Sequence, residues 1–263
     1  MDKFKLFFQG ILIGIGKIIP GVSGSMIAIS LGIYEKFVYY LSNIFSNFKK
    51  SILYLIPLCL GISLSIILGS RIILFFLNNY YFVTMMLFIG LITGGIPSIY
   101  HETKKEKNKN NLLILTLPFI FLLLFDIMIN KFDFNINYTC VSAFFLGIIE
   151  AISSIIPGIS GTAIMMMLGV YNDVLETLST IMYIDKLIFF VIGLIIGIIM
   201  ISKIINYFLK KHKTKTYYCI LGFVFSSILI LFRNLIYYKA SIYSIFLGII
   251  LFILGYFISS KLE

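Results

Sequence analysis

The chain has 263 residues, of which 60% are hydrophobic and only 12% are charged, a composition that excludes an ordinary soluble domain. Its net charge of +10 would suit a nucleic-acid-binding protein, but the basic residues lie in short segments between apolar runs, where they act as topology signals. We therefore predict an all-α polytopic membrane protein that is surrounded by membrane lipids and has no nucleic-acid partner.

The first predicted element is an apolar hairpin over residues 5–38, which is interrupted in its middle by Pro20, Gly21, Ser23 and Gly24. Proline removes a backbone donor and disfavours helix at the residue before it, and glycine permits a tight turn. Because each arm is short for a membrane span, we expect a re-entrant hairpin that enters and leaves by one face. A hairpin that crosses fully is the alternative.

Three apolar runs long enough to cross a bilayer follow the hairpin, at residues 52–77, 80–100 and 112–130. A basic loop separates the last two runs, and a short polar link begins at Lys131. We therefore predict that residues 1–131 form one structural unit, made of a broken hairpin and three transmembrane helices.

The second half of the chain, residues 132–263, has the same plan. Its hairpin covers residues 140–172 and contains a second Pro-Gly-x-Ser-Gly interruption. The interrupting residues are Pro157, Gly158, Ser160 and Gly161. Three more transmembrane helices are predicted at residues 186–209, 216–236 and 240–259.

The two hairpins are copies of one another, because residues 18–44 and 155–181 are identical at 13 of 27 positions. The spans that follow also match: Ser70-Arg71-Ile72-Ile73 aligns with Ser202-Lys203-Ile204-Ile205. Similarity at a fixed spacing indicates two structural units of one kind. Three spans, an odd number, separate the hairpins, so re-entrant hairpins place the second unit upside down relative to the first.

The distribution of basic residues tests this topology. With the N-terminus in the cytoplasm, 14 lysines fall in cytoplasmic segments and three in outer segments. This asymmetry agrees with the positive-inside rule. We therefore predict inverted-topology repeats with both termini in the cytoplasm. Two fully crossing hairpins give the same asymmetry, so charge does not separate the two kinds of hairpin.

The two breaks form the predicted binding site. Broken helices at membrane depth occur where they line a cavity or are buried in protein, and a matched pair points to the site of a transporter. A helix that starts at a break presents N–H groups and partial positive charge, which favour an anion such as phosphate. Ser23 and Ser160 are predicted N-caps, and Ser25 and Thr162 add hydroxyl donors.

Ionisable residues inside apolar segments are further candidates, because burying a charge is costly. Lys17 and Glu150 lie beside the breaks, where a substrate-binding role competes with a structural salt bridge. Arg71 and Lys203 are repeat partners, and we expect them to supply positive charge to the anion from opposite faces. A turn that only permits tight helix packing is the competing interpretation of the breaks themselves.

Nothing in the sequence predicts a metal or a cofactor. Cys59, Cys140 and Cys219 show no pairing pattern, and no Walker loop, dinucleotide-binding motif or catalytic triad is present. Arg233 and Asp126 lie near span ends, where snorkelling to the interface competes with a function. A proton or a sodium ion is the expected coupling partner if transport is driven, and no particular oligomer is predicted.

Three segments carry a family resemblance: Ile-Pro-Gly-Val-Ser-Gly followed by Leu-Gly-Ile-Tyr-Glu, the internal Ile-Pro-Gly-Ile-Ser-Gly copy, and residues 90–97. Together they resemble the PopT family of polyprenyl-phosphate transporters. The resemblance implies translocation of undecaprenyl phosphate, a lipid carrier that must return from the outer leaflet after cell-wall sugars are delivered. It also implies that the Pro, Gly and Ser residues of both motifs form the central substrate site. That family often has an acidic residue where Lys17 stands.

Two other functions fit parts of the pattern. A secondary transporter of a small soluble anion can use the same broken hairpins, and competition by water-soluble anions would separate it from a lipid transporter. A polyprenyl-pyrophosphate phosphatase also uses inverted broken hairpins, but it needs a glutamate cluster and an arginine beside the serine. Here Glu150 stands alone. We therefore predict a lipid-phosphate transporter and not an enzyme.

Overall fold

The computed structural model describes residues 3–18, 23–104, 110–131, 136–179 and 183–262. Every regular element in these ranges is an α-helix, and none of them is a strand. Within the same ranges, six helical segments are long and apolar enough to cross a membrane. The prediction of an all-α polytopic membrane protein is therefore confirmed.

The helices of the first half are α1 (Lys3–Ile18), α2 (Gly24–Ser30), α3 (Tyr34–Ser42), α4 (Phe48–Asn79), α5 (Tyr81–Gly94), α6 (Ile96–Thr103) and α7 (Asn110–Lys131). Those of the second half are α8 (Cys140–Ile155), α9 (Gly161–Met167), α10 (Tyr171–Ser179), α11 (Ile184–Lys211), α12 (Lys213–Ile236) and α13 (Ile242–Leu262).

The second arm of each hairpin differs from the prediction, which treated residues 21–38 and 158–172 as single arms. Each arm contains a turn between two short helices: α2 and α3 are separated at Gly32 (φ 66°), and α9 and α10 at Gly169 (φ 71°). The later helices, α3 and α10, extend beyond the predicted arms, to Ser42 and Ser179. Glycine adopts this left-handed backbone readily, and it ends the preceding helix. The Leu-Gly-x-Tyr segment that both copies share is therefore a turn.

The predicted span at residues 80–100 is also divided, because α5 and α6 meet at Gly95. Pro97 lies in the first turn of α6, where proline is tolerated. Gly95 packs so closely on Ser30 that a Cβ atom at this position would overlap it. By contrast, α4 is one continuous helix that extends beyond the predicted span of residues 52–77 at both ends.

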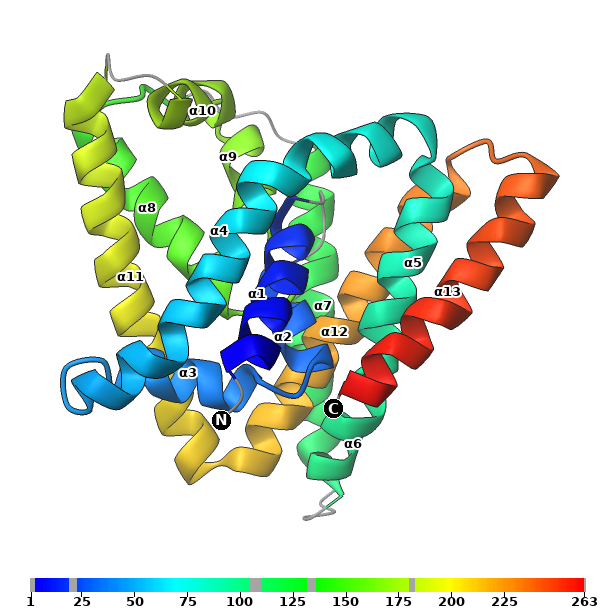
Figure 1. Cartoon of the computed structure of the whole chain (residues 1–263), viewed down its shortest axis with the longest axis horizontal. Helices are drawn as coiled ribbons and strands as arrows, with labels where there is room; N and C mark the ends of the chain where they lie inside the picture. Colours follow the sequence, from blue (N-terminus) through cyan, green and yellow to red (C-terminus); the bar gives the residue numbers. More distant parts are fainter. Residues whose placement is uncertain (1–2, 19–22, 105–109, 132–135, 180–182, 263) are drawn as a thin grey trace.

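The two ends of the bundle differ in what they carry. Both chain termini lie at one end, with α3, α6 and the junction of α11 and α12 (Figure 1). We call this end the terminal face. The opposite end, the distal face, carries α10, the junction of α4 and α5, and the connection from α12 to α13. The first hairpin begins and ends toward the terminal face, whereas the second begins and ends toward the distal face (Figure 1).

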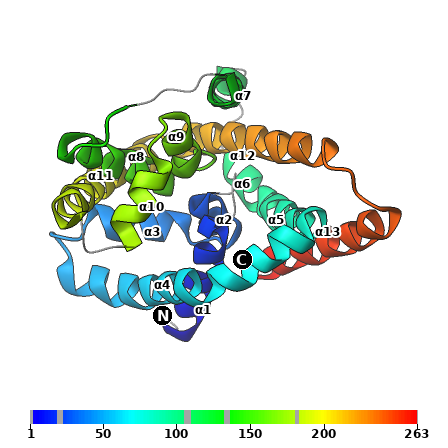
Figure 2. The ribbon, with the colours of Figure 1, turned by 90° about the horizontal axis from the view of Figure 1, so that it is seen from above.

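The long helices pair both within and between the two halves. α1 packs along α4, and α8 packs along α11, so each of these pairs stays within one half. α5, however, packs along α13, and α12 packs along α7. In the view from above, α7 lies at the edge of the molecule beside α12 (Figure 2). Each half therefore supplies its last long helix to the other half.

Glycines bring the paired helices into backbone contact. A Cβ atom at Gly61 of α4 would overlap the carbonyl of Phe7 in α1, and a Cβ atom at Gly193 of α11 would overlap the carbonyl of Phe144 in α8. Small residues at such contacts are a common means of helix association in membranes. Because Gly61 and Gly193 are aligned in the two halves, the same contact is made twice.

We expect Gly193→Val to destabilise the protein, because the valine side chain has no room against the backbone of α8. Overpacking of this kind costs about 1–3 kcal/mol. Thermal unfolding of the purified protein in detergent measures the loss, and Gly61→Val is expected to show a similar one. Ile195→Val is the matched control, since Ile195 lies on the same helix and is 52% exposed. Equal melting temperatures for Gly193→Val and the control would contradict this packing.

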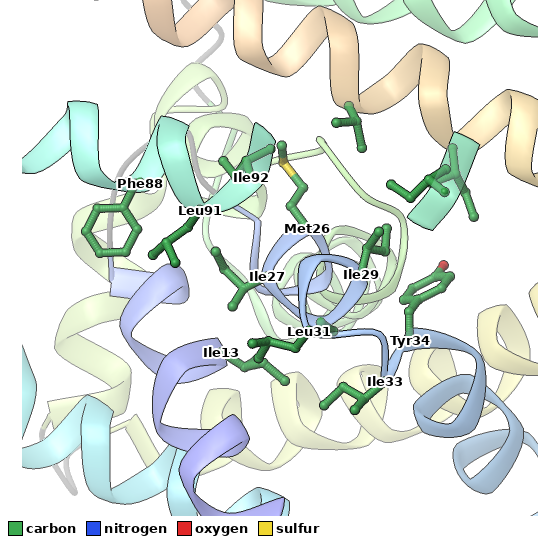
Figure 3. Packing of buried hydrophobic residues seen from close by; sticks show 14 of the residues in the cluster. Ile13, Met26, Ile27, Ile29, Leu31, Ile33, Tyr34, Phe88, Leu91 and Ile92 are labelled. Atoms are coloured by element: carbon green, nitrogen blue, oxygen red, sulfur yellow. The ribbon is translucent and has the colours of Figure 1, made fainter. Parts of the chain in front are cut away.

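The buried core surrounds α2, all of whose residues are buried. Met26 of α2, Ile13 of α1 and Ile92 of α5 belong to one apolar cluster (Figure 3). From another side, the hydroxyl of Ser259 in α13 donates a hydrogen bond to the carbonyl of Ser30 (2.9 Å). These contacts hold α2, and therefore fix the position of Ser23, which directly precedes it.

Candidate functional site

The two breaks meet inside the bundle, where a cavity of about 30 Å³ lies between them. One wall comes from the end of α1 and the start of α2, and the other from the end of α8 and the start of α9. The lining residues are Lys17, Ser23, Gly24, Glu150, Ser153, Ile159, Ser160 and Gly161. The fold thus brings together six of the residues that the sequence marks as site candidates.

An ion pair joins the two hairpins across this cavity. Lys17 Nζ lies 3.0 Å from Glu150 Oε1 and donates a second hydrogen bond to Ser154 Oγ (2.8 Å). Ser154 in turn donates to the backbone carbonyl of Glu150 (2.7 Å). The lysine and glutamate side chains are 29% and 22% exposed, so solvent screens the pair only in part. The salt bridge that competes with a binding role is therefore present, and it lies within the candidate site.

Serine hydroxyls line the cavity beside the ion pair. Ser23 Oγ donates to the carbonyl of Ser153 (3.1 Å) and lies 2.7 Å from Ser25 Oγ. Because a hydroxyl has one proton, Ser25 is the donor between the two serines. The Ser23 hydroxyl therefore joins the first break to α8 of the second hairpin.

The prediction that Ser23 caps α2 holds for its backbone but not for its side chain. Ser23 occupies the N-cap position with extended backbone (φ −94°, ψ 135°), yet its hydroxyl makes no capping hydrogen bond. Its carbonyl accepts from Met26 N (3.0 Å). The hydroxyl instead bonds across to the other hairpin, because the two breaks lie in contact.

Gly24 and Gly161 permit this contact. A Cβ atom at Gly24 would lie 2.8 Å from Lys17 Cγ, and one at Gly161 would lie 2.5 Å from Ser153 Oγ. Both distances are shorter than side chains tolerate. The repeated glycine after each serine therefore leaves space for the side chains that line the cavity.

The cavity in this conformation is small. A single water requires about 10–15 Å³ of this kind of space, so about 30 Å³ accommodates very few atoms. A phosphate group fits only if Lys17 and Glu150 separate or the hairpins move apart. The site as described is therefore closed around its own ion pair.

Other predicted residues have different positions. Pro20 and Gly21 lie outside the described residues, as do the side chains of Arg71 in α4 and Thr162 in α9. Lys203 is exposed on α11 and is not among the residues that line the cavity. The predicted approach of Lys203 to the anion is therefore absent from this conformation.

Pro157 and Gly158 shape the second break without lining the small cavity. Pro157 is buried, and Gly158 has a left-handed backbone (φ 84°), which glycine adopts without strain. Arg233 and Asp126 form an ion pair of 2.6 Å that ties α12 to α7. Their role in the described structure is thus to join two helices.

Sequence reasoning missed three polar residues at the site. Ser153 and Ser154 follow Glu150 by three and four residues, which places them beside it on one face of α8. Tyr34 is buried, and its hydroxyl donates to the carbonyl of Ile155 (2.9 Å), the last residue of α8. The cluster of Glu150, Ser153 and Ser154 within an apolar arm was a signal that the sequence contained.

A second polar cluster closes the terminal face. Lys213 Nζ of α12 lies 2.8 Å from Glu35 of α3 and 3.2 Å from Glu102 of α6. The hydroxyl of Tyr217 also donates to Glu35 (2.5 Å). These side chains line a cavity of about 340 Å³. We call Glu35, Glu102, Lys213 and Tyr217 the terminal-face cluster, which joins three helices of both halves.

Two curated relatives are similar to the chain along most of its length. One, from Staphylococcus aureus (strain NCTC 8325 / PS 47), is named polyprenyl-phosphate transporter and is 30% identical over 278 aligned residues, covering all of this chain and 97% of the relative. The other, from Vibrio cholerae serotype O1, has the same name and is 28% identical over 232 aligned residues, covering 82% of this chain and 73% of the relative. No solved structure matches the chain.

Both names agree with the family that the doubled Pro-Gly-x-Ser-Gly motif resembles. The model of the undecaprenyl phosphate translocase-like family matches residues 13–237, which include both breaks and most of the long helices. The chain therefore belongs to the undecaprenyl phosphate translocase-like family.

Proposed function

We propose that this protein transports undecaprenyl phosphate, or a closely similar polyprenyl phosphate, across the bacterial plasma membrane, and so recycles the carrier lipid. The observation that carries the proposal is the meeting of two broken hairpins at one lysine and several hydroxyl groups inside an apolar bundle. Such a site suits a phosphate, and the names of the relatives agree with that substrate.

The bundle is best interpreted as two inverted repeats, residues 1–131 and 132–263, each a re-entrant hairpin with three long helices. Supporting this, residues at matching repeat positions face each other: Ser23 and Ser160 line one cavity, and Lys17 bonds to its counterpart Ser154. A two-fold pseudosymmetry axis that passes through the site produces such contacts. In this proposal the terminal face, with both termini, lies in the cytoplasm, and the lysines gathered in its segments support that orientation through the positive-inside rule.

The phosphate binds in this proposal by replacing Glu150 as the partner of Lys17. A dissociated glutamate and a lipid phosphate are both anions, so they compete for one ammonium group. Protonation of Glu150 weakens its hold on Lys17 and is the simplest means of coupling transport to a proton; sodium is the alternative coupling ion. Ser23, Ser25, Ser160 and Thr162 supply hydroxyl donors once the hairpins move apart.

Transport by alternating access accounts for the closed terminal face. α3 packs along α11 there, whereas among the described residues α10, the counterpart of α3, makes no comparable contact with α4. The conformation is therefore more firmly closed toward the cytoplasm than toward the outside. Rocking of one repeat against the other exposes the site to each side in turn.

The other two functions receive less support. A phosphatase needs several acid–base groups at the break, and Glu150 is the one carboxylate among the described lining residues, where it is engaged by Lys17. A carrier of a small soluble anion needs no large apolar cavities, yet two such cavities adjoin the hairpins. A substrate with a phosphate and a long apolar tail would occupy both the polar site between the breaks and the apolar cavities beside it.

The decisive experiment is exchange of labelled polyprenyl phosphate between the leaflets of proteoliposomes. We expect the purified protein to accelerate the appearance of the headgroup on the opposite leaflet, relative to protein-free vesicles, and excess inorganic phosphate to compete poorly. Release of inorganic phosphate from a polyprenyl pyrophosphate would instead favour the phosphatase. No acceleration by folded protein under any proton or sodium gradient would overturn the proposal.

A further inference from the structure

Two large apolar cavities adjoin the hairpins, with volumes of about 450 Å³ and about 750 Å³. Eight residues that line the larger one are each followed 132 positions later by a residue that lines the smaller one. Examples are Phe76 with Phe208, and Leu87 with Cys219. Since 132 is also the spacing of the aligned spans, the two cavities occupy the same place in the two halves.

The two cavities lie toward opposite faces of the bundle. The smaller one lies between α11 and α12 and includes His212, at their junction on the terminal face. The larger one lies between α4 and α5 and includes Tyr80, at their junction on the distal face. Phe208 and Phe76 in the walls are both 45% exposed. Each cavity is therefore open in part to the surroundings of the bundle, one nearer each face.

Both cavities reach the hairpins beside the candidate site. The smaller is lined by Ile156 and Pro157, at the start of the second break. The larger is lined by Leu12 and Ile15 of α1, and Ile15 is separated by one residue from Lys17. Each cavity is therefore lined in part by residues that directly adjoin one of the two breaks in the sequence.

We propose that the two cavities hold the prenyl chain of the transported lipid, the larger for lipid in the outer leaflet and the smaller for lipid in the inner leaflet. This inference rests on the proposed function and adds where the tail lies. The volumes are those of small-molecule pockets, roughly 300–1,000 Å³, so each cavity holds only the part of the chain nearest the phosphate. The remainder of the chain stays in the bilayer.

The charge at the mouth of the smaller cavity favours an anionic lipid over a neutral one. Lys215 lines the smaller cavity, together with His212, whereas their repeat counterparts in the larger cavity are Val83 and Tyr80. A lysine at the terminal-face mouth attracts the phosphate of a lipid there. The smaller cavity therefore combines apolar walls for a tail with a cation for a headgroup, as the inward-released product requires.

Native and introduced cysteines report on the two cavities. Cys59→Ala with Cys140→Ala leaves Cys219 in the smaller cavity, and further changes Cys219→Ala and Leu87→Cys move the thiol to the matching position in the larger one. In proteoliposomes we expect polyprenyl phosphate to slow reaction of both thiols with a lipid-soluble maleimide at least several-fold. A variant that keeps only Cys59, which is exposed on α4, is the control and should not be protected.

Bulky substitutions test whether occupancy matters for transport. Cys219→Trp and Leu87→Trp fill one cavity each, and we expect each to slow leaflet exchange about tenfold or more, because the tail path is blocked on one side. Ile195→Trp adds the same side chain at an exposed position of α11 and should exchange normally. Size-exclusion profiles and melting temperatures verify that the variants are folded.

The outcomes separate this inference from the proposed function. If the wild-type protein exchanges lipid while neither thiol is protected and both tryptophan variants work normally, the tail sites are wrong and the function stands. If an equal amount of phosphatidylglycerol protects as well as polyprenyl phosphate, the cavities hold ordinary bilayer lipid and the inference is overturned. Absence of exchange by the folded wild-type protein defeats the proposed function itself.

Discussion

Lys17→Ala is expected to reduce leaflet exchange of polyprenyl phosphate at least tenfold. The substitution removes the one cation that lines the described cavity between the breaks. The Glu150 carboxylate then keeps the hydrogen bond that it accepts from the Ser154 hydroxyl (3.3 Å) but has lost its ion pair. A charge-assisted hydrogen bond contributes about 1.5–3 kcal/mol, and the unpaired carboxylate also repels the phosphate. Initial rates of exchange in proteoliposomes measure the effect.

Glu150→Gln tests whether Glu150 competes with the lipid phosphate for Lys17 or only stabilises the hairpins through a salt bridge. Glutamine keeps the size of the side chain but releases Lys17 from an ion pair, so we expect tighter binding of polyprenyl phosphate. In the double variant with Lys17→Ala, the repulsion is absent and part of the lost activity should return. Lys261→Ala is the control, because this lysine is exposed in the last turn of α13, outside the candidate site. If Lys17→Ala exchanged lipid at the wild-type rate, Lys17 would have no role in binding the phosphate.

Lys213→Ala is expected to open the terminal face. Lys213 holds Glu35 of α3 and Glu102 of α6, and at the matching positions the distal face has Tyr81, Asn172 and Asn234. The carboxylate and lysine contacts of the terminal-face cluster therefore have no ionisable counterparts at the matching positions of the distal face. Exposed ion pairs contribute up to about 1 kcal/mol each, so losing two shifts the ratio of closed to open molecules by roughly tenfold.

A cysteine at Ile99 measures this opening. Ile99 is 2% exposed and lines the cavity of the terminal-face cluster. In a background without the native cysteines, we expect Lys213→Ala to speed its reaction with a water-soluble maleimide about tenfold, and high salt to have a smaller effect in the same direction. Lys211→Ala is the matched control, because Lys211 bonds to Tyr207 of its own helix. Unchanged labelling in Lys213→Ala would exclude a gating role.

The repeat in the sequence was sufficient to predict that the two breaks lie at one site. It was not sufficient to predict which side chains of one break contact which side chains of the other. Repeat spacing identifies Ser23 with Ser160 and Gly24 with Gly161, and an inverted arrangement places such pairs around one axis. Lys17 and Glu150 are not repeat counterparts, so their pairing depends on how the two hairpins cross. Tertiary packing around α2 determines how the hairpins cross, and no local sequence pattern predicts that packing.

The turns inside the hairpins were not predicted, because the whole second arm of each hairpin is apolar. Residues 21–38 are hydrophobic enough to be taken as one arm, because burial makes a turn such as that at Gly32 as apolar as the helices around it. The repeated Leu-Gly-x-Tyr segment contained the relevant signal. The partners of α5 and α7 were likewise unpredictable, since all the long helices are apolar and a hydropathy profile does not say which of them pack together.

The exchange of long helices between the halves determines the order of assembly during synthesis. α7 packs along α12, and α5 along α13, so two helices of the first half are inserted before their main partners have been translated. α13 leaves the ribosome after every helix of the first half, and until it docks, the glycine-lined side of α5 lacks its main neighbour. Folding of the first half is therefore completed only after α13 has been translated, and a nascent chain that stalls before α13 leaves α5, in the first half, without its main partner.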